Sequence, residues 1–371
     1  MRPRHVYVHV PFCARRCSYC DFSIAVRKVV PASAFARSVA SELALRFPRE
    51  TEPWVADTLY LGGGTPSRLG GAGVAELLAV LRDRINLAPG AEVTLEANPE
   101  DVSAAAALAW REAGVTRVSL GAQSFDDRVL AWMHRVHDAA TTTAAVRTLR
   151  QAGIVELSLD LIFSVPESLN RDWARDVSAA LALEPDHLSL YGLTVESGTP
   201  LGRWAARGEV REAPEERYAD EFLHAHRAAT EAGFVHYEVS NFGRGAARGV
   251  HNAAYWRGVP FAGLGPSAHG FDGATRRWNV SAFAAWQGAL GAGDDPVEGE
   301  ERLREDEAIM EQVYLGLRTH EGLALDPAEW PIAEPWLAAQ WAERRGDRLA
   351  LTPEGWLRMD SLALTLIGSR L

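Results

Sequence analysis

Six short runs rich in β-branched and other apolar residues recur along the first half of the chain, and each is followed by room for a helix. They cover residues 6–10, 58–61, 92–96, 117–120, 156–162 and 187–190. The segments between them repeat apolar residues at steps of three and four, as one face of a helix does. This alternation predicts an α/β fold with a parallel sheet and right-handed crossovers. A closed barrel has eight such units, so six predict a partial (β/α)6 barrel with a lateral opening.

The alternation ends near residue 233, where aromatic- and glycine-rich segments begin. A helix with an acidic first turn is predicted over 303–318. The remaining residues indicate a helix, a strand at 348–351, a turn and a helix at 356–366, which resembles a small winged-helix module. We therefore predict a partial barrel over 1–233 and a C-terminal α+β domain over 234–371.

Composition excludes some classes of protein. The chain has 371 residues, of which 47% are hydrophobic, enough to bury a core without disulfides. Its net charge of −11, and the lack of a long Lys/Arg block, argue against a nucleic-acid partner. No run of 18 apolar residues occurs, and the first residues are too polar for a signal peptide, so we expect no transmembrane segment and a cytoplasmic location.

All three cysteines of the chain, Cys13, Cys17 and Cys20, lie within eight residues at C-x₃-C-x₂-C spacing. Such crowding suits metal ligands in a reducing compartment better than disulfides. A structural zinc site would need a fourth ligand, such as His9 or His5. A redox pair at Cys17 and Cys20 would leave Cys13 unexplained. We favour a [4Fe–4S] cluster with three cysteine ligands and one iron open to another ligand.

Polar and glycine residues follow consecutive predicted strands at the point where each strand ends. They are Gly63, Gly64, Thr65, Glu96, Gln123 and Asp160. Because the carboxyl ends of parallel strands share one edge, these residues are expected to face a common pocket beside the cysteines. A strand-end carboxylate can instead cap a helix, and Arg135 can be a solvated helix residue or a cation that grips a carboxylate. His134 and His137 are spaced like metal ligands, although a surface pair is the simpler interpretation.

The cysteine motif, with Tyr19 beside the third cysteine, resembles the radical S-adenosylmethionine (SAM) superfamily. Five segments further resemble the oxygen-independent coproporphyrinogen III oxidases and their relatives, the heme chaperones. These segments are residues 7–13, 62–66, 96–99, 119–125 and 160–166. The resemblance implies that SAM binds at the open iron. The residues it assigns to SAM are Tyr7, Gly63, Gly64, Thr65, Glu96, Gln123, Arg135 and Asp160.

Three features favour the chaperone branch. The oxidases carry a fourth cysteine where this chain has Phe22, and a long extension where this chain has twelve residues before Cys13. The third feature is the sequence from His251 to Trp256, which resembles an H-N-x-x-Y-W signature of the chaperones. The resemblance implies a heme carrier, rather than a coproporphyrinogen dehydrogenase, that delivers heme to acceptor hemoproteins, respiratory ones among them, and that forms a homodimer. The alternative is SAM-dependent oxidative decarboxylation of coproporphyrinogen III.

A heme carrier needs an axial ligand that can be released, and neutral imidazole is a suitable one. His251, close to two aromatic residues, is our predicted ligand. The same motif could instead pin a loop to the barrel rim, and His9, His236 and His269 are competing ligands.

The chain departs from the resembled family at two positions. His134 stands before Arg135 where the family usually has glycine. Ser164 likewise replaces the glycine of a Gly-Leu-Pro segment. Neither change removes a predicted ligand, so we expect them to affect the shape of the pocket.

Overall fold

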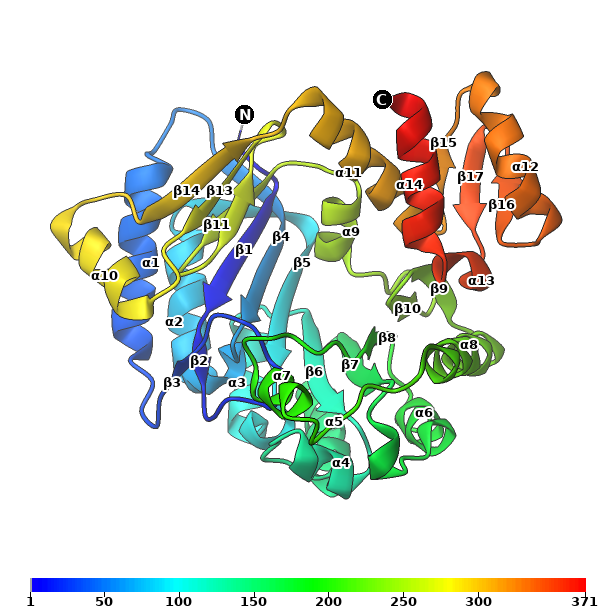
Figure 1. Cartoon of the computed structure of the whole chain (residues 1–371). Coiled ribbons are helices and arrows are strands. Elements are labelled where there is room, and N and C mark those ends of the chain that lie inside the picture. Colours follow the sequence, from blue (N-terminus) through cyan, green and yellow to red (C-terminus); the bar gives the residue numbers. More distant parts are fainter. Residues whose placement is uncertain (1) are drawn as a thin grey trace.

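The core of the chain is a 12-stranded sheet, seen in a computed structural model that describes residues 2–371 (Figure 1). Six parallel strands follow one another across its middle in chain order. They are β1 (His5–Val10), β4 (Trp54–Gly63), β5 (Ile85–Ala97), β6 (Arg117–Gln123), β7 (Glu156–Phe163) and β8 (His187–Gly192). Each contains a predicted run, so the expected partial barrel is confirmed.

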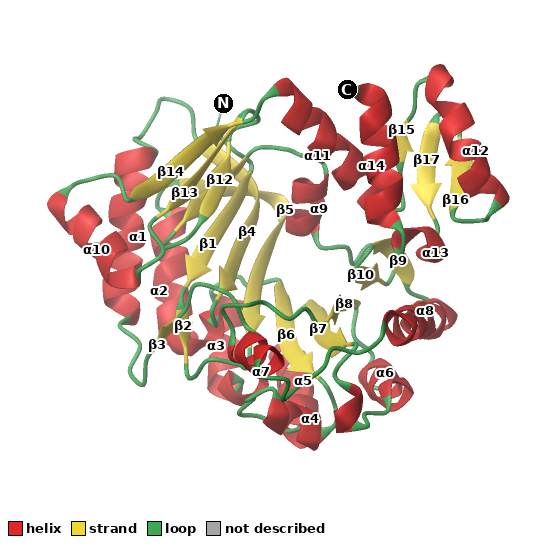
Figure 2. Ribbon diagram, in the orientation of Figure 1, coloured by secondary structure: helices red, strands yellow, loops and turns green. Residues whose placement is uncertain are grey.

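Helices cover the outer side of this curved sheet, while loops cross its inner side (Figure 2). The main outer helices are α1 (Ala32–Arg46), α2 (Gly70–Arg82), α3 (Ala104–Glu112), α5 (Ala139–Ala152), α6 (Trp173–Leu181) and α8 (Glu215–Glu231). Shorter helices are α4 (Asp127–Trp132), α7 (Pro200–Ala206), α9 (Val250–Trp256) and α10 (Phe283–Ala292).

Alternation along β1 shows why the strands carry both core and site. Successive side chains of a strand point to opposite faces. Val6, Val8 and Val10 are fully buried in the hydrophobic core. The intervening Tyr7 and His9 pair in register with Tyr60 and Gly62 of β4, so they project from the other face, toward the inside of the barrel.

Strands from beyond residue 233 extend the same sheet at both edges. On one edge β11 (Phe261–Leu264) runs parallel to β1 and is followed by antiparallel strands β12 (His269–Phe271), β13 (Thr275–Asn279) and β14 (Val297–Arg302). On the other edge β10 (Asn241–Gly243) and β9 (Val235–Glu238) run antiparallel. The boundary at 233/234 therefore falls within one continuous sheet, and independent folding of residues 1–233 stays a prediction.

The C-terminal residues form a small separate layer beside α11 (Glu305–Arg318). Its three-stranded sheet has the order β15 (Leu323–Ala324), β17 (Arg348–Leu351), β16 (Ala342–Arg345). Its helices are α12 (Trp330–Ala338), α13 (Pro353–Trp356) and α14 (Met359–Arg370). The hairpin of β16 and β17 beside these helices matches the expected winged-helix-like arrangement. The helix predicted over 356–366 is divided between α13 and α14.

Candidate cofactor site

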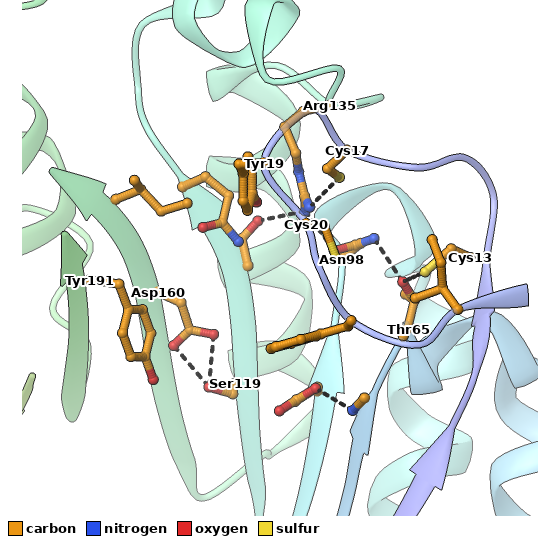
Figure 3. A pocket seen from close by; sticks show the side chains of 18 of the residues that line it. Cys13, Cys17, Tyr19, Cys20, Thr65, Asn98, Ser119, Arg135, Asp160 and Tyr191 are labelled. Atoms are coloured by element: carbon orange, nitrogen blue, oxygen red, sulfur yellow. Dashed lines mark hydrogen bonds between the residues drawn. The ribbon is translucent and has the colours of Figure 1, made fainter. Parts of the chain in front are cut away.

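A cavity of about 460 Å³ opens at the carboxyl ends of the parallel strands. We call it the cofactor cavity. All three cysteines and seven of the eight residues assigned to SAM line it, and Figure 3 shows several of them. The predicted residues in its lining are Cys13, Cys17, Cys20, Gly63, Gly64, Thr65, Glu96, Gln123, Arg135 and Asp160. Tyr7 is the exception, because it lines a neighbouring cavity.

The three cysteines lie on the segment from β2 (Phe12–Cys13) to β3 (Ala25–Val26), which we call the cysteine loop. Pairing of β2 with β3 holds its two ends, and the Ser18 amide within it donates to the Met133 carbonyl over 3.2 Å. The three thiols are free of disulfides. Burial raises the pKa of Cys13 to about 11 and also raises that of Cys20. Metal binding must therefore displace protons from these thiols.

Arg135 connects two of the cysteines through a chain of polar contacts. Its Nη1 lies 3.5 Å from Cys17 Sγ, and its Nη2 donates to Asn98 Oδ1 over 2.6 Å and to the Gly121 carbonyl over 3.0 Å. Asn98 Nδ2 donates to Thr65 Oγ1 over 3.4 Å, and this hydroxyl lies 3.3 Å from Cys13 Sγ. Arg135 is thus a site residue rather than a solvated one. Sequence reasoning gave Asn98 no role, although it lies in the segment 96–99 that carries the resemblance.

Two carboxylates face the cavity from adjacent parts of the sheet. Glu96 accepts hydrogen bonds from the Tyr60 hydroxyl over 2.8 Å and from the Gly63 amide over 3.0 Å. Burial raises its pKa to about 7. Asp160 accepts from the hydroxyls of Ser119 over 2.9 Å and Ser158 over 3.2 Å.

Burial likewise raises the pKa of Asp160. The two serines that hold it were missed in the sequence. Ser119 and Ser158 pair in register on β6 and β7. Serines in two neighbouring predicted strands were the sequence signal that could have identified them.

Glycine is required in the turn at the end of β4, because neighbouring atoms leave no space for a side chain. Gly63 has a φ of +107°, and a Cβ added there would lie 2.6 Å from His9 Nδ1. A Cβ on Gly64 would lie 2.7 Å from the Pro11 carbonyl. The turn must therefore lie directly against β1 and the start of the cysteine loop, which brings it to the cluster position.

Both departures from the resembled family occur at left-handed backbone positions. His134 has a φ of +60° and Ser164 a φ of +58°. Glycine adopts this conformation without steric cost, whereas other residues are strained there. His137, predicted as one half of a surface pair, is instead buried, with one ring nitrogen 3.1 Å from the Ala122 carbonyl and the other 3.1 Å from Glu100.

His251 is 1% exposed and has both ring nitrogens engaged. Nδ1 lies 2.7 Å from Thr58 Oγ1 and Nε2 lies 2.7 Å from the Tyr255 hydroxyl. Burial lowers its pKa to about 3, so the ring is neutral. Backbone amides at the start of α9 also donate to Glu92. These contacts pin α9 to the sheet, which is the alternative role that the sequence left open.

The cysteine arrangement suits a cluster. Among residues 2–371 no group of three or more His, Cys, Asp or Glu side chains is placed to hold a single metal ion. A cubane cluster does not require such convergence, because each cysteine binds a different iron. Three thiols around one cavity, with two of them bonded to Thr65 and Arg135, fit a [4Fe–4S] cluster.

Comparison with known proteins identifies the superfamily and the relatives of this chain. Residues 7–180 match the model of the radical SAM superfamily. A heme chaperone HemW of Mycobacterium tuberculosis is 41% identical over 99% of this chain and 95% of its own length. The HemW of a Synechocystis species is 34% identical over 87% of this chain and 80% of its own.

A solved structure shares the fold over the whole chain. Coproporphyrinogen III oxidase (HemN) from Escherichia coli superposes with a TM-score of 0.81 at 21% identity, covering 100% of this chain and 91% of the oxidase. Radical SAM proteins bind a [4Fe–4S] cluster and SAM, so the superfamily implies both for this chain. The similarity in sequence and fold places the chain in the HemW family of the radical SAM superfamily.

Proposed function

We propose that this chain is a heme chaperone, which binds heme and passes it to acceptor hemoproteins. The observation that carries the proposal is the 41% identity, over nearly the full length of both chains, to a protein named heme chaperone HemW. Two cavities that meet at the cysteine loop support it. One has the polar lining expected for the cofactors, and the other has an aromatic lining suited to a flat apolar ligand.

In this proposal Cys13, Cys17 and Cys20 bind three irons of the [4Fe–4S] cluster. When bound, the cluster supplies a low-potential electron. The Thr65 hydroxyl lies 3.3 Å from Cys13 Sγ and the Arg135 guanidinium 3.5 Å from Cys17 Sγ, so both donors flank the cluster ligands.

SAM is held in the same cavity by residues from successive strands. Arg135 offers donors to its carboxylate, while Glu96 and Asp160 accept from its amine and hydroxyl groups. Gly63, Gly64, Thr65 and Gln123 line the intervening surface. Tyr7 supports the glycine turn from β1, because a Cβ on Gly62 would lie 2.9 Å from its ring.

The alternative function is coproporphyrinogen oxidation, and one experiment separates the two. Cluster-loaded protein is incubated without oxygen with SAM, a reductant and coproporphyrinogen III, and porphyrins are separated by chromatography. In a parallel sample heme is titrated and followed by its Soret absorbance. We expect saturable heme binding and no decarboxylated product. Protoporphyrinogen formation would show that the chain is an oxidase.

We further propose a cytoplasmic location, respiratory hemoproteins among the acceptors, and a homodimer. Three free thiols in one loop suit a reducing compartment. Within residues 2–371 no helix is both long and apolar enough to span a bilayer. Equilibrium sedimentation with and without the cluster tests the homodimer.

A further inference from the structure

A second cavity, of about 590 Å³, adjoins the cofactor cavity at the cysteine loop. We call it the aromatic cavity. The two cavities share Asp21, Phe22 and Gly63 as lining residues. Apolar side chains from α9, the loop after it, two added strands and α11 form much of the wall. They are Tyr255, Trp256, Val259, Phe261, Phe271 and Leu315.

Three of these aromatic rings lie close to one another. The rings of Tyr255 and Phe261 lie 4.6 Å apart at 74°, and Phe261 lies 6.4 Å from Phe271. Phe22, from the cysteine loop, is 57% exposed. A rigid aromatic wall of this kind binds flat apolar molecules at little cost in side-chain entropy.

Axial ligation of heme requires a histidine with a ring nitrogen available at the cavity. The chain has 11 histidines. In residues 2–371 only His134, His224 and His269 have no hydrogen bond to either ring nitrogen. His134 lines the cofactor cavity, and His224 lies on α8 outside both cavities. Of these three, only His269 lines the aromatic cavity. His9 lines it too, but its ring nitrogens lie within hydrogen-bonding distance of the Tyr7 hydroxyl and the Ser23 carbonyl.

The surroundings of His269 suit reversible ligation. It begins β12, is exposed, and stacks on Trp278 with 5.8 Å between ring centroids and 23° between planes. Partial burial and the nearby Arg276 lower its pKa, so the ring is neutral and its nitrogen lone pair is available. An exposed ligand can also be replaced by one from an acceptor protein.

One cation in the wall of the aromatic cavity can pair with a propionate of a porphyrin. Arg276 is the only Lys or Arg among the described residues that line the aromatic cavity. Its guanidinium lies 5.8 Å from the Phe271 ring centroid, and its Nη2 lies 2.6 Å from a Glu311 oxygen. A propionate can take the place of the Glu311 carboxylate as its partner.

We propose that the aromatic cavity is the heme site, with His269 as the axial ligand and Arg276 as the partner of a propionate. This inference rests on the proposed heme-carrier function and specifies where it occurs. Ligation forms one bond from an imidazole nitrogen to the heme iron, displaces a water ligand and leaves the oxidation state unchanged. His251 then acts as a structural residue that positions Tyr255 and Trp256.

The test is heme titration of the full-length, cluster-loaded protein and of single variants, followed by absorbance and electron paramagnetic resonance. His269→Ala should weaken heme binding roughly tenfold or more and remove the imidazole signature. Added imidazole should restore that signature. His269→Met should move the Soret band to the position of a thioether ligand, a change that a merely structural role would not produce.

Two further variants serve as matched controls. His224→Ala, at the other unbonded histidine outside the cofactor cavity, should leave the titration unchanged. His251→Gln retains hydrogen-bonding groups for Thr58 and Tyr255 and should keep imidazole ligation. Loss of ligation in His251→Gln together with a normal spectrum in His269→Ala would overturn the inference while leaving the carrier function intact. A wild-type protein that binds no heme would overturn the carrier function itself.

Discussion

The cofactor cavity and the aromatic cavity meet at the cysteine loop, yet they are built in different ways. The first is lined mainly by side chains at the carboxyl ends of strands that follow one another in sequence. The second combines β1 with α9, β11 to β13 and α11, so its lining runs from Tyr7 to Leu315. Strand order places the strand-end residues of the first cavity, which also takes lining from the cysteine loop, Arg135 and Asn252. The second cavity depends on how distant segments dock on the edge of the sheet.

The largest expected effect separates the two cavities by removing the cluster. Cys13→Ser, Cys17→Ser and Cys20→Ser should each reduce bound iron from about four per chain to background, because each removes one of three thiolate ligands. Heme affinity should change by less than roughly threefold, because the aromatic cavity has its own walls. Iron analysis and heme titration measure the two effects. If heme binding disappeared with the iron, the two cavities would be one functional site.

A smaller effect is expected at Arg135. Arg135→Ala should raise the Kd for SAM by roughly 30-fold or more, because it removes a partly buried cation that contacts Cys17, Asn98 and Gly121. Arg135→Lys keeps the charge but loses the forked geometry of the guanidinium. Its Kd for SAM should therefore lie between those of the wild type and Arg135→Ala. Calorimetric titration of cluster-loaded protein measures the affinity. Equal SAM affinity in all three proteins would contradict the proposed role.

Glu96 gives the cofactor cavity a pH dependence of stability. Burial raises its pKa from 4.5 to about 7, so the folded protein holds a proton that the unfolded chain releases between these values. The free energy of unfolding should therefore fall by about 2 kcal/mol as pH rises from 5 to 7.5. Urea unfolding of metal-free protein measures the slope, which Glu96→Gln should flatten. A slope unchanged by this substitution would place the titration elsewhere.

The smallest effects concern the two left-handed positions at which the chain departs from the resembled family. His134→Gly and Ser164→Gly should each raise the free energy of unfolding by about 0.5–1 kcal/mol, because glycine relieves the left-handed strain. Ser38→Gly, within α1, is the matched control and should lower stability by a similar amount. Denaturant unfolding compares the three. Destabilisation at all three positions would mean that side-chain contacts outweigh the strain.

The sequence was sufficient for the parallel strands because buried parallel strands are continuous apolar runs. β6 and β7 match their predicted runs closely. The strands added at the edges of this sheet, β9 to β14, were not predicted, since β12 has three residues and β11 has four, and their place in the sheet depends on tertiary pairing. The boundary expected at 233/234 lies within the sheet for this reason.

The candidate site shows the same division. Seven of the eight residues assigned to SAM line the cofactor cavity. Six do so because they lie at or near the ends of consecutive strands, while Arg135 lines it from the segment between α4 and α5. Tyr7 lies in the other cavity, since alternation on β1 and the glycine turn direct its ring there. The engagement of His251 Nδ1 depends on Thr58, nearly two hundred residues away, and no local pattern reveals that contact.

The proposed heme-carrier function depends most on the transfer of heme by this chain. Heme-loaded, cluster-loaded protein is mixed with an apo-hemoprotein acceptor, the two are separated, and the absorbance of each is recorded over time. We predict that heme leaves the chain and appears in the acceptor faster than heme that albumin releases into solution. Heme that stays on the chain, or reaches the acceptor only at the rate of the albumin control, would contradict it.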